Sequence, residues 1–305
     1  MLIHVVRPGE TVYAIARNYG VDPRRLMADN GVPADGALAV GQTLVLRFPN
    51  VVHAVRPGET LSAIARSYGV SLRSLWRNNP KLLGGSLLAP GQVLVITYHE
   101  ERLGTAVANG YAYPYPFLSP ALLAETAPFL TYLTPFTYGI SRDLGLLPLR
   151  DGELLAGARA HGTGAVMHLS TYTEEEQFDV GRAERLLTDP AAQARLLEEI
   201  QRTMAEKGFS GLDVDFEYLP GALAEAYAAF LSRLRQALRT QGHFLWAALA
   251  PKTRADQPGT LYEGHDYARV GAATDAVLLM TYEWGYTYGP PIAVAPLPNV
   301  RAVLD

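Results

Sequence analysis

Three acidic side chains occupy alternate positions in the stretch FSGLDVDFEYLP, residues 209–220. Successive side chains of an extended strand point to opposite faces, so Asp213, Asp215 and Glu217 share one face of a strand here. Neighbours in such a row lie roughly 6 to 7 Å apart, too close to ionise independently once water is excluded. At least one of the three acids is therefore expected to hold a proton at neutral pH.

The segments on either side of this row decide between two interpretations. A short D-x-D run on its own fits a solvated edge strand whose acids face water. Here, however, the flanking segments 189–211 and 221–242 carry apolar residues at three- and four-residue spacing, as amphipathic helices do. A strand between two such helices is typical of a mostly parallel sheet covered on its outside. The acids are then expected to point into a barrel and to emerge at its mouth.

The region from residue 105 onward repeats this strand-and-helix alternation. Apolar stretches at 105–113, 130–140, 163–172, 209–216, 243–251 and 274–282 are separated by helical segments. The pattern predicts a parallel (β/α) barrel, an α/β fold whose chemistry gathers at the carboxyl ends of the strands. The predicted strands end in polar or aromatic residues, namely Tyr111, Tyr113, Tyr138, His168, Ser170, Glu217, Lys252, Tyr282, Glu283 and Trp284. Aromatic rings there could stack on sugar rings, although tyrosines at strand ends more often serve packing.

The front of the chain is an internal repeat. Residues 4–30 align without gaps to residues 53–79, with 17 identities in 27 positions. Each copy reads as a short strand (3–6 or 52–55), a Pro-Gly turn, a helix capped by Thr11 or Thr60, a stop at Gly20 or Gly69, a second short helix and a closing strand. A core this small is marginal, and tandem copies of a small module favour multivalent binding over chemistry.

Composition sets limits on function. The chain has 305 residues, 49% of them hydrophobic and 18% charged, which is ordinary for globular domains. It contains no cysteine, which excludes disulfides, thiolate metal sites and thiol nucleophiles. Residues 1–103 hold 11 Lys and Arg against 7 Asp and Glu, so the front is mildly basic and the remainder acidic. No basic cluster interleaved with aromatics suggests nucleic acid, and no segment suggests a signal peptide or membrane span. The histidines lack metal-ligand spacing, and we expect no metal or cofactor.

The repeat resembles the LysM domain. Both copies carry the V-x-x-G-E-T opening, an Asn near the end of the second helix and a G-Q-x-L closing. The resemblance implies binding of N-acetylglucosamine-containing glycans, chiefly peptidoglycan or chitin. It places the glycan groove at the following residues: Gly9, Glu10, Thr11, Val12, Asn30, Gly58, Glu59, Thr60, Leu61, Asn79 and Pro80. The alternative for the Gly, Thr and Asn residues among them is turn and cap chemistry alone.

The acid row resembles the D-G-x-D-x-D-x-E motif of glycoside hydrolase family 18, and LLMTYEWG resembles that family's M-x-Y-D on strand six. Ser210 stands in place of the motif's first Asp and Glu283 in place of the Asp after Tyr282. Two LysM copies ahead of such a barrel are similar to the spore cortex-fragment lytic enzymes of endospore-forming bacteria.

The family 18 resemblance also implies residue roles. Glu217 would protonate the glycosidic oxygen, and Asp215 would orient the 2-acetamido group so that its carbonyl oxygen attacks the anomeric carbon, with retention of configuration. Asp213 would share a proton with Asp215, and Tyr282 would donate a hydrogen bond to the acetamido oxygen. These four residues are the catalytic candidates. The substrate-binding candidates are Tyr111, Tyr113, Met280, Glu283, Trp284 and Lys252.

The expected organisation is LysM domains at 1–49 and 50–98 and a (β/α)8-type TIM barrel at 105–305. Six strands can be counted where eight are needed, so we expect the barrel to be incomplete in this chain. The expected substrate is peptidoglycan of spore cortex or cell wall, reached without a signal peptide. Two alternatives stay open, a non-catalytic glycan-binding coat protein and a chitinase. The sequence does not give the oligomeric state.

Overall fold

The computed structural model describes residues 1–82, 87–99, 104–114, 116, 118–175, 177–285, 288–289 and 292–305. The chain divides into two compact units. One consists of residues 1–108, 119–130 and 160–163, and the other of residues 109–118, 131–159 and 164–305. None of the helices in these described residues has the length and apolarity that a bilayer crossing requires.

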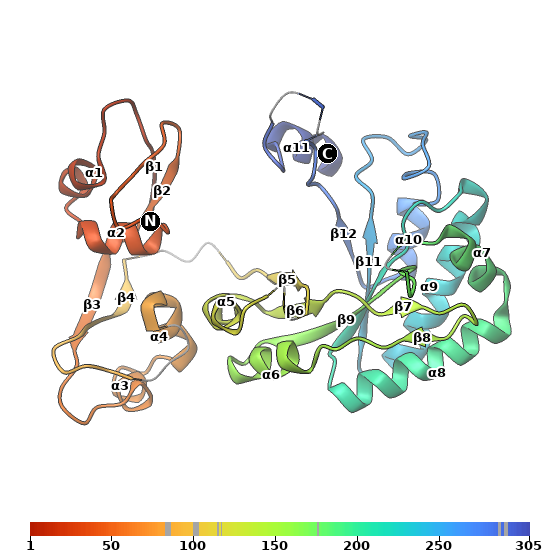
Figure 1. Ribbon diagram of the computed structural model, residues 1–305, viewed down its shortest axis with the longest axis horizontal. Coiled ribbons are helices and arrows are strands. Elements are labelled where there is room, and N and C mark those ends of the chain that lie inside the picture. The colour runs from red at the N-terminus through yellow and green to blue at the C-terminus, as the bar shows by residue number, and fades with distance from the viewer. Residues whose placement is uncertain are drawn as a thin grey trace. The chain divides into compact units, whose positions relative to one another are not determined.

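The first unit contains the two repeat modules (Figure 1). The first module comprises β1 (Leu2–Val5), α1 (Val12–Tyr19), α2 (Pro23–Asp29) and β2 (Thr43–Leu46). The second comprises β3 (Pro49–Ala54), α3 (Leu61–Ser67), α4 (Leu72–Asn78), η1 (Pro80–Leu82) and β4 (Val93–Tyr98). The same unit also includes α5 (Pro120–Thr126) and η2 (Ala127–Phe129).

Each module follows the predicted β-α-α-β order. β1 pairs antiparallel with β2, and β3 with β4. The hydroxyl of Thr11 accepts from Ala14 N and that of Thr60 from Ala63 N, which caps the first helix of each copy. Gly20 ends α1 in the left-handed conformation at φ 67°. The opening strands begin earlier than predicted, at Leu2 and Pro49.

The second unit is built on a parallel sheet. Within the described residues its six strands run in the order β12-β11-β10-β9-β6-β5. Their bounds are β5 (Asn109–Ala112), β6 (Tyr132–Pro135), β9 (Gly164–Ser170), β10 (Gly211–Asp215), β11 (Phe244–Leu249) and β12 (Ala276–Leu279). A small antiparallel hairpin that the sequence pattern did not predict, β7 (Gly139–Ile140) with β8 (Leu146–Leu147), follows β6.

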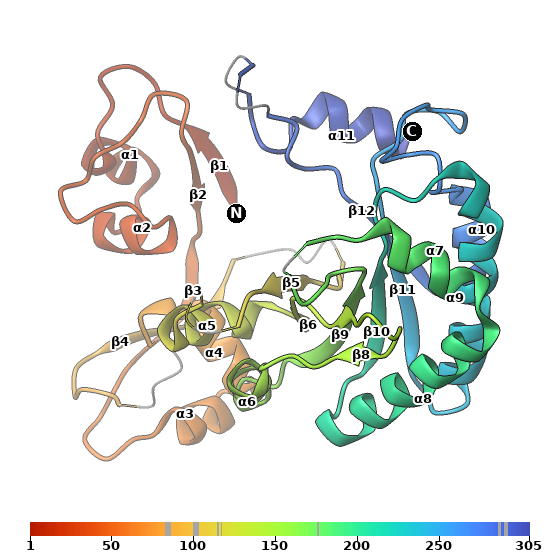
Figure 2. The ribbon, with the colours of Figure 1, turned by 45° about the vertical axis from the view of Figure 1, so that its right-hand side comes forward.

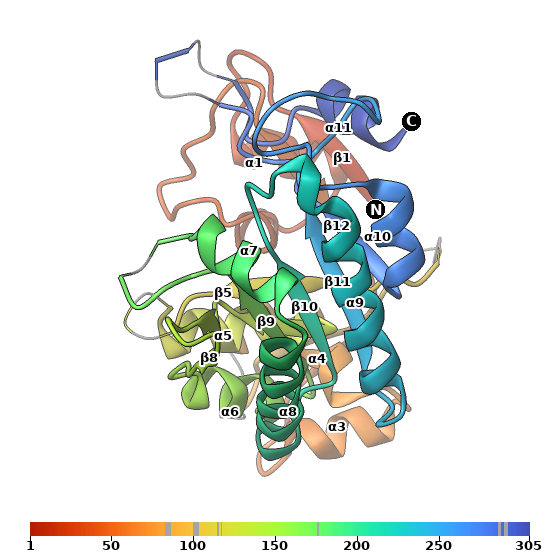
Figure 3. The ribbon, with the colours of Figure 1, turned by 90° about the vertical axis from the view of Figure 1, so that its right-hand side faces the viewer.

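Helices cover one face of this sheet, as Figures 2 and 3 show. The helices of the unit are α6 (Gly152–Ala160), α7 (Val180–Thr188), α8 (Pro190–Lys207), η3 (Gly221–Leu223), α9 (Ala224–Arg239), α10 (Tyr267–Ala273) and α11 (Leu297–Leu304). Leu212, Val214 and Phe216 of the acid stretch are fully buried in the core with residues of α7, α8 and α9. The acids alternate with these residues, so they lie on the opposite face, as the sequence pattern predicted.

Candidate active site

The acid row lies on a central strand of the sheet, because β10 pairs with β9 on one side and β11 on the other. The solvated edge strand that the sequence left open is therefore wrong. Asp213 is fully buried and Asp215 is 5% exposed. The strand ends at Asp215, and Glu217 follows it in a half-buried turn where Tyr218 adopts φ 58°. The third acid thus sits past the end of the strand rather than on it.

Side chains from two other strands contact the buried acids. His168 of β9 is in register with Asp213, and its Nε2 lies 3.5 Å from Oδ2 of Asp215 and 4.0 Å from Oδ2 of Asp213. The hydroxyl of Tyr111, on β5, donates a hydrogen bond to Oδ2 of Asp213. Among the described residues, Oδ1 of Asp213 and Oδ1 of Asp215 are buried without a hydrogen-bond partner.

A cavity of about 950 Å³ opens over the carboxyl ends of these strands. Asp215 and Glu217 line it, as do His168 and Pro251 from the neighbouring strands and the loops that follow them. A volume of this size accommodates a ligand of a few sugar rings. The cavity therefore lies where a parallel barrel gathers its chemistry.

Burial controls ionisation around the cavity. It raises the pKa of Glu217 to about 7, with further contributions from the charges of Asp215 and Glu283. It raises the pKa of Asp213 as well. Burial opposes the charged form of His168, but the hydrogen bond with Asp215 and the negative charges around it raise the pKa of the imidazole. The site therefore keeps protons on an acid and on a histidine close to neutral pH.

Most of the predicted substrate-binding residues line this cavity. They are Tyr111, Tyr113, Met280, Glu283 and Trp284, and Tyr282, which was predicted to be catalytic, lines it as well. Burial beside Asp215 and Glu283 raises the pKa of Tyr282 to about 12, so its hydroxyl keeps its proton and can donate it to a ligand. Glu283 adopts φ 58°, which turns the chain at the end of the M-T-Y-E segment.

Lys252 is not brought to the cavity, in contrast to the sequence prediction. β11 ends at Leu249, three residues before Lys252, and Lys252 is not among the residues that line the cavity. The Lys252 ammonium donates to the carbonyl of His265 at 3.1 Å, and its backbone N–H donates to the Tyr267 hydroxyl at 2.8 Å. Its side chain therefore anchors a loop.

Two further strand-end residues serve packing. The hydroxyl of Tyr138 donates to Oδ2 of Asp151 at 2.5 Å and accepts from Nζ of Lys207 at 2.8 Å, in a buried polar cluster that shares no residue with the lining of the cavity. Ser170 is fully buried, and its hydroxyl lies 3.0 Å from that of Thr137. A position at a strand end therefore does not by itself place a side chain in the cavity.

Sequence reasoning missed several residues of the site. Asn109, Phe136, Phe178, Leu261 and Tyr262 line the cavity. Except for Asn109, they lie in loops between strands and helices, and no periodic pattern marks such positions.

His265 was missed because its partners are distant in sequence. Its Nε2 donates to the carbonyl of Phe216 and its Nδ1 accepts from Ala250 N, each at 2.9 Å. Burial lowers the pKa of this imidazole, consistent with the neutral form that the two bonds require. It thus fixes the backbone immediately before Glu217.

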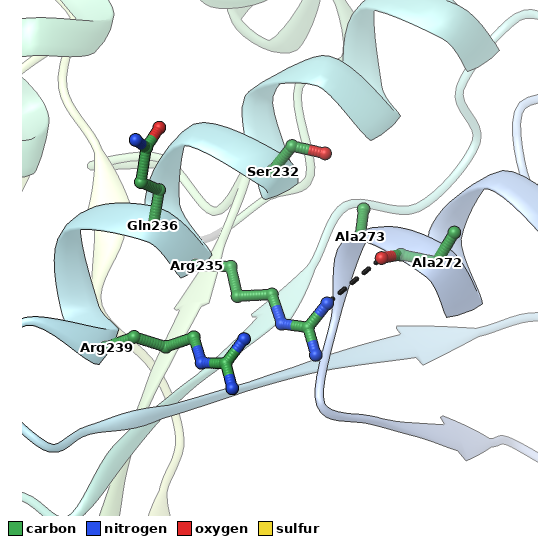
Figure 4. A pocket seen from close by; sticks show the side chains of 6 residues that line it. All are labelled: Ser232, Arg235, Gln236, Arg239, Ala272 and Ala273. Carbon is green, nitrogen blue, oxygen red and sulfur yellow. Dashed lines mark hydrogen bonds between the residues drawn. The ribbon is translucent and has the colours of Figure 1, made fainter.

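A second hollow in the same unit lies between α9 and α10 (Figure 4). Its volume is about 360 Å³, and it shares no lining residue with the acid cavity. Arg235 there donates to the Ala272 carbonyl at 3.0 Å and pairs with Asp275 at 2.9 Å. The guanidinium therefore ties α9 to the end of α10.

In the repeat modules, several predicted glycan-binding side chains are occupied by the fold itself. Asn30 bonds to Leu26 O, Val45 O and Val45 N, and Asn79 makes the equivalent three bonds in the second copy. Val12 and Leu61 are core residues, each 1% exposed. The turn and cap alternative therefore describes Asn30, Asn79 and the hydroxyls of Thr11 and Thr60, whereas Val12 and Leu61 pack in the module cores.

The other residues of the predicted groove are two glycines, a proline and two glutamates. Gly9 and Gly58, both at φ 81°, turn exposed backbone, and Pro80 is half-buried. Glu10 accepts from Arg7 N and Glu59 from Arg56 N, each at 2.7 Å, which closes the turn after the first strand. In this region the turn backbone at the two glycines is exposed, whereas the two glutamates bond within their own turns.

No cluster of three or more His, Asp or Glu residues suited to a metal ion occurs in the described parts of the chain. The chemistry available at the cavity is that of a protonated carboxylic acid beside a carboxylate, a histidine and tyrosine hydroxyls. Such a set supports general acid catalysis on a ligand held above β10.

Known proteins resemble this chain over both the repeat modules and the unit that holds the acid row. The LysM domain family matches residues 4–47 and 53–97, and Glycosyl hydrolases family 18 matches residues 173–298. The chain is 38% identical to the cortical fragment-lytic enzyme of Bacillus subtilis (strain 168), over 100% of this chain and 71% of that protein. It is 34% identical to the enzyme of the same description from Bacillus anthracis, over 99% of this chain and 70% of that one. The crystal structure of the Bacillus cereus spore cortex-lytic enzyme SleL matches with a TM-score of 0.74 and 32% identity, over 99% of this chain and 70% of that chain.

Proposed function

Because the chain belongs to the LysM-containing glycoside hydrolases of family 18, we propose that it cleaves N-acetylglucosamine glycosidic bonds in fragments of spore-cortex peptidoglycan. The relatives described as cortical fragment-lytic enzymes support this substrate. The LysM and family 18 matches imply binding of N-acetylglucosamine-containing glycans. The place of action that fits these relatives is the spore.

One observation carries the proposed chemistry. Glu217 ends the acid row at the cavity, half-buried, with a pKa raised to about 7. A carboxyl group with this pKa is protonated in about half of the molecules at neutral pH, which suits a general acid. In the proposed reaction it donates its proton to the glycosidic oxygen as the bond to the anomeric carbon breaks.

We assign the nucleophile to the substrate. In this scheme Asp215 orients the 2-acetamido group, whose carbonyl oxygen attacks the anomeric carbon to give an oxazolinium intermediate, and water then opens it with retained configuration. Asp215 lines the cavity, and its Oδ1 is buried without a hydrogen-bond partner among the described residues, so a turn of this carboxylate toward the cavity would bring that oxygen to the acetamido N–H. Tyr282 lines the same cavity and can donate to the acetamido oxygen.

Mass spectrometry of cortex fragments incubated with the protein tests the activity directly. New reducing ends at N-acetylglucosamine are expected, with the β-anomer appearing first by proton NMR. Parallel incubations with chitin and with vegetative peptidoglycan rank the substrates. Retention of every fragment intact, with the protein bound to it, would favour the glycan-binding coat role instead.

A further inference from the structure

His168, on the strand beside the acid row, has no role in the scheme above, yet it is buried and contacts several residues of the site. His168 is 1% exposed, and the Phe136 ring packs against its imidazole with centroids 5.0 Å apart and planes tilted by 31°. The Tyr111 ring meets it edge-on at 5.5 Å. Water is thus kept from two faces of the imidazole, which strengthens its interaction with charged neighbours.

Both ring nitrogens of His168 have partners. Nδ1 lies 2.7 Å from the hydroxyl oxygen of Thr137, and that hydroxyl can donate onward to Ser170 Oγ at 3.0 Å or to the Tyr138 carbonyl at 3.2 Å. Nε2 faces carboxylate oxygens, which only accept. If Thr137 donates onward, Nδ1 is left to donate to its hydroxyl oxygen, and a ring that donates from both nitrogens is an imidazolium.

The charges around this ring are unbalanced without it. The titratable groups that face His168 are Asp213, Asp215 and Glu217 from β10 and the segment after it, and Tyr111 from β5. Two carboxylates buried this deeply on one strand repel each other unless a cation or a proton intervenes. His168 is in register with Asp213 and reaches Asp215, so it touches both.

We propose that His168 is a positioning residue for the reaction: its imidazolium neutralises one of the two buried carboxylate charges and fixes the orientation in which Asp215 meets the acetamido group. Oδ2 of Asp215 lies 3.5 Å from Nε2 of His168, whereas Oδ1 is buried without a partner among the described residues, so a turn of the carboxylate about its contact with His168 would present Oδ1 to the ligand. The inference rests on the proposed function, since it assigns Asp215 its task. It adds a cation that sets the charge of the whole row.

The first test compares His168→Gln with the unmodified full chain. Glutamine keeps an N–H donor but carries no charge. We expect kcat on soluble cortex fragments to fall about 10- to 100-fold, the size that a misplaced catalytic group produces, while KM changes by less than about threefold. The positive charge of His168 also lowers the pKa of Glu217. The alkaline limb of the kcat profile is therefore expected to move up by about half to one pH unit. A kcat within twofold of the unmodified value, or an unmoved alkaline limb, overturns the proposal.

A matched control uses a histidine at the other end of the sheet. His243 lies just before β11, with Nδ1 3.4 Å from the Ser210 carbonyl, and it does not line the cavity. His243→Gln is expected to leave both kcat and its pH profile unchanged. An equal loss in both variants would show that the His168 effect is structural.

If thermal unfolding shows that His168→Gln is not cooperatively folded, the same test is made with Thr137→Val. It removes the hydroxyl that accepts from Nδ1 while nearly preserving side-chain volume. A smaller fall in kcat, with the alkaline limb moved in the same upward direction, supports the proposal. An unchanged profile contradicts it.

A readout that needs no turnover separates this inference from the proposed function. Nitrogen-15 NMR of histidine-labelled protein reports the protonation of each ring, and His168→Gln assigns its signals. Two protonated ring nitrogens are expected for His168 at pH 7 in the inactive Glu217→Gln variant, and one in Asp215→Asn at the same pH. A neutral ring at pH 7 refutes the charge assignment, whereas a charged ring, together with an unmodified protein that cleaves no fragment, refutes only the proposed activity.

Discussion

The LysM modules and the barrel each bring together a histidine, a carboxylate and a tyrosine, and the carboxylate behaves oppositely in the two settings. In the first module His4 bridges Glu10 at 2.8 Å and the Tyr19 hydroxyl at 3.2 Å, and His53 repeats the arrangement with Glu59 and Tyr68. A backbone hydrogen bond from Arg7, helped by His4, lowers the pKa of Glu10.

In the barrel the corresponding group is His168, Asp213 and Tyr111. Burial raises the pKa of Asp213 despite the neighbouring imidazole and the tyrosine hydroxyl bond. Both groups combine an imidazole, a carboxyl group and a phenol, so the difference comes from solvent and backbone donors. A half-buried carboxylate with a backbone N–H partner closes a turn and has a lowered pKa, whereas burial beside a second acid raises the pKa of a carboxyl group. The variants below test this contrast, from the largest expected effect to the smallest.

Glu217→Gln is expected to lower kcat on cortex fragments at least 100-fold, because the amide cannot protonate the leaving oxygen. The dinitrophenolate group of a 2,4-dinitrophenyl glycoside of an N-acetylglucosamine oligomer leaves without protonation. Cleavage of this substrate is therefore expected to fall far less. Steady-state rates on both substrates make the measurement. Unchanged turnover of cortex fragments would refute the general-acid assignment.

Asp215→Asn is expected to slow cleavage about 10- to 100-fold, since the amide no longer holds the acetamido group as a carboxylate does. Binding of the glycan, measured by calorimetry in the Glu217→Gln background, is expected to stay within about threefold. Lost binding with normal turnover would contradict the role given to Asp215.

The pH dependence follows from the raised pKa of Glu217. The acid must be protonated to act, so kcat is expected to fall as pH rises through about 7.

Stability depends on the same proton. The folded state binds it more tightly than the unfolded chain, so Glu217 lowers stability as pH rises from the ordinary glutamate pKa of 4.5 through 7. Glu217→Gln is therefore expected to melt a few degrees higher than the unmodified protein at pH 8 and equally at pH 4. Thermal unfolding at the two pH values checks this, and equal melting at both would contradict it.

Glu10→Gln and Glu59→Gln probe the other side of the contrast and should have the smallest effects. Their pKa values are lowered by the turn N–H bonds, so each carboxylate stabilises its module above pH 4.5 and ceases to do so as pH falls below that value. Slightly lower unfolding temperatures at pH 7, converging with the unmodified protein at pH 3, are expected. Hydrolysis of soluble fragments should stay within about twofold, and a larger loss would mean that these acids serve the reaction.

The fold was largely accessible from the sequence because its periodicities are local. The repeat of 17 identities, the Thr11 and Thr60 caps and the alternation of strands and helices each lie within a short stretch. The hairpin of β7 and β8 was missed because its strands are two residues long. Lys252 does not line the cavity, and the sequence could not show this because a strand-end position does not say which way the following loop turns.

By itself the sequence determined the order of modules, the shared face of Asp213 and Asp215 and the apolar face behind them, because side-chain direction along a strand follows from spacing alone. The tertiary structure decided which partners the acids meet. His168 and Tyr111 lie 45 and 102 residues from Asp213 along the chain, and they reach it because the sheet order places β9 beside β10 and β5 where its tyrosine reaches Asp213. Burial at that meeting point sets the pKa values, and no spacing in the sequence encodes it.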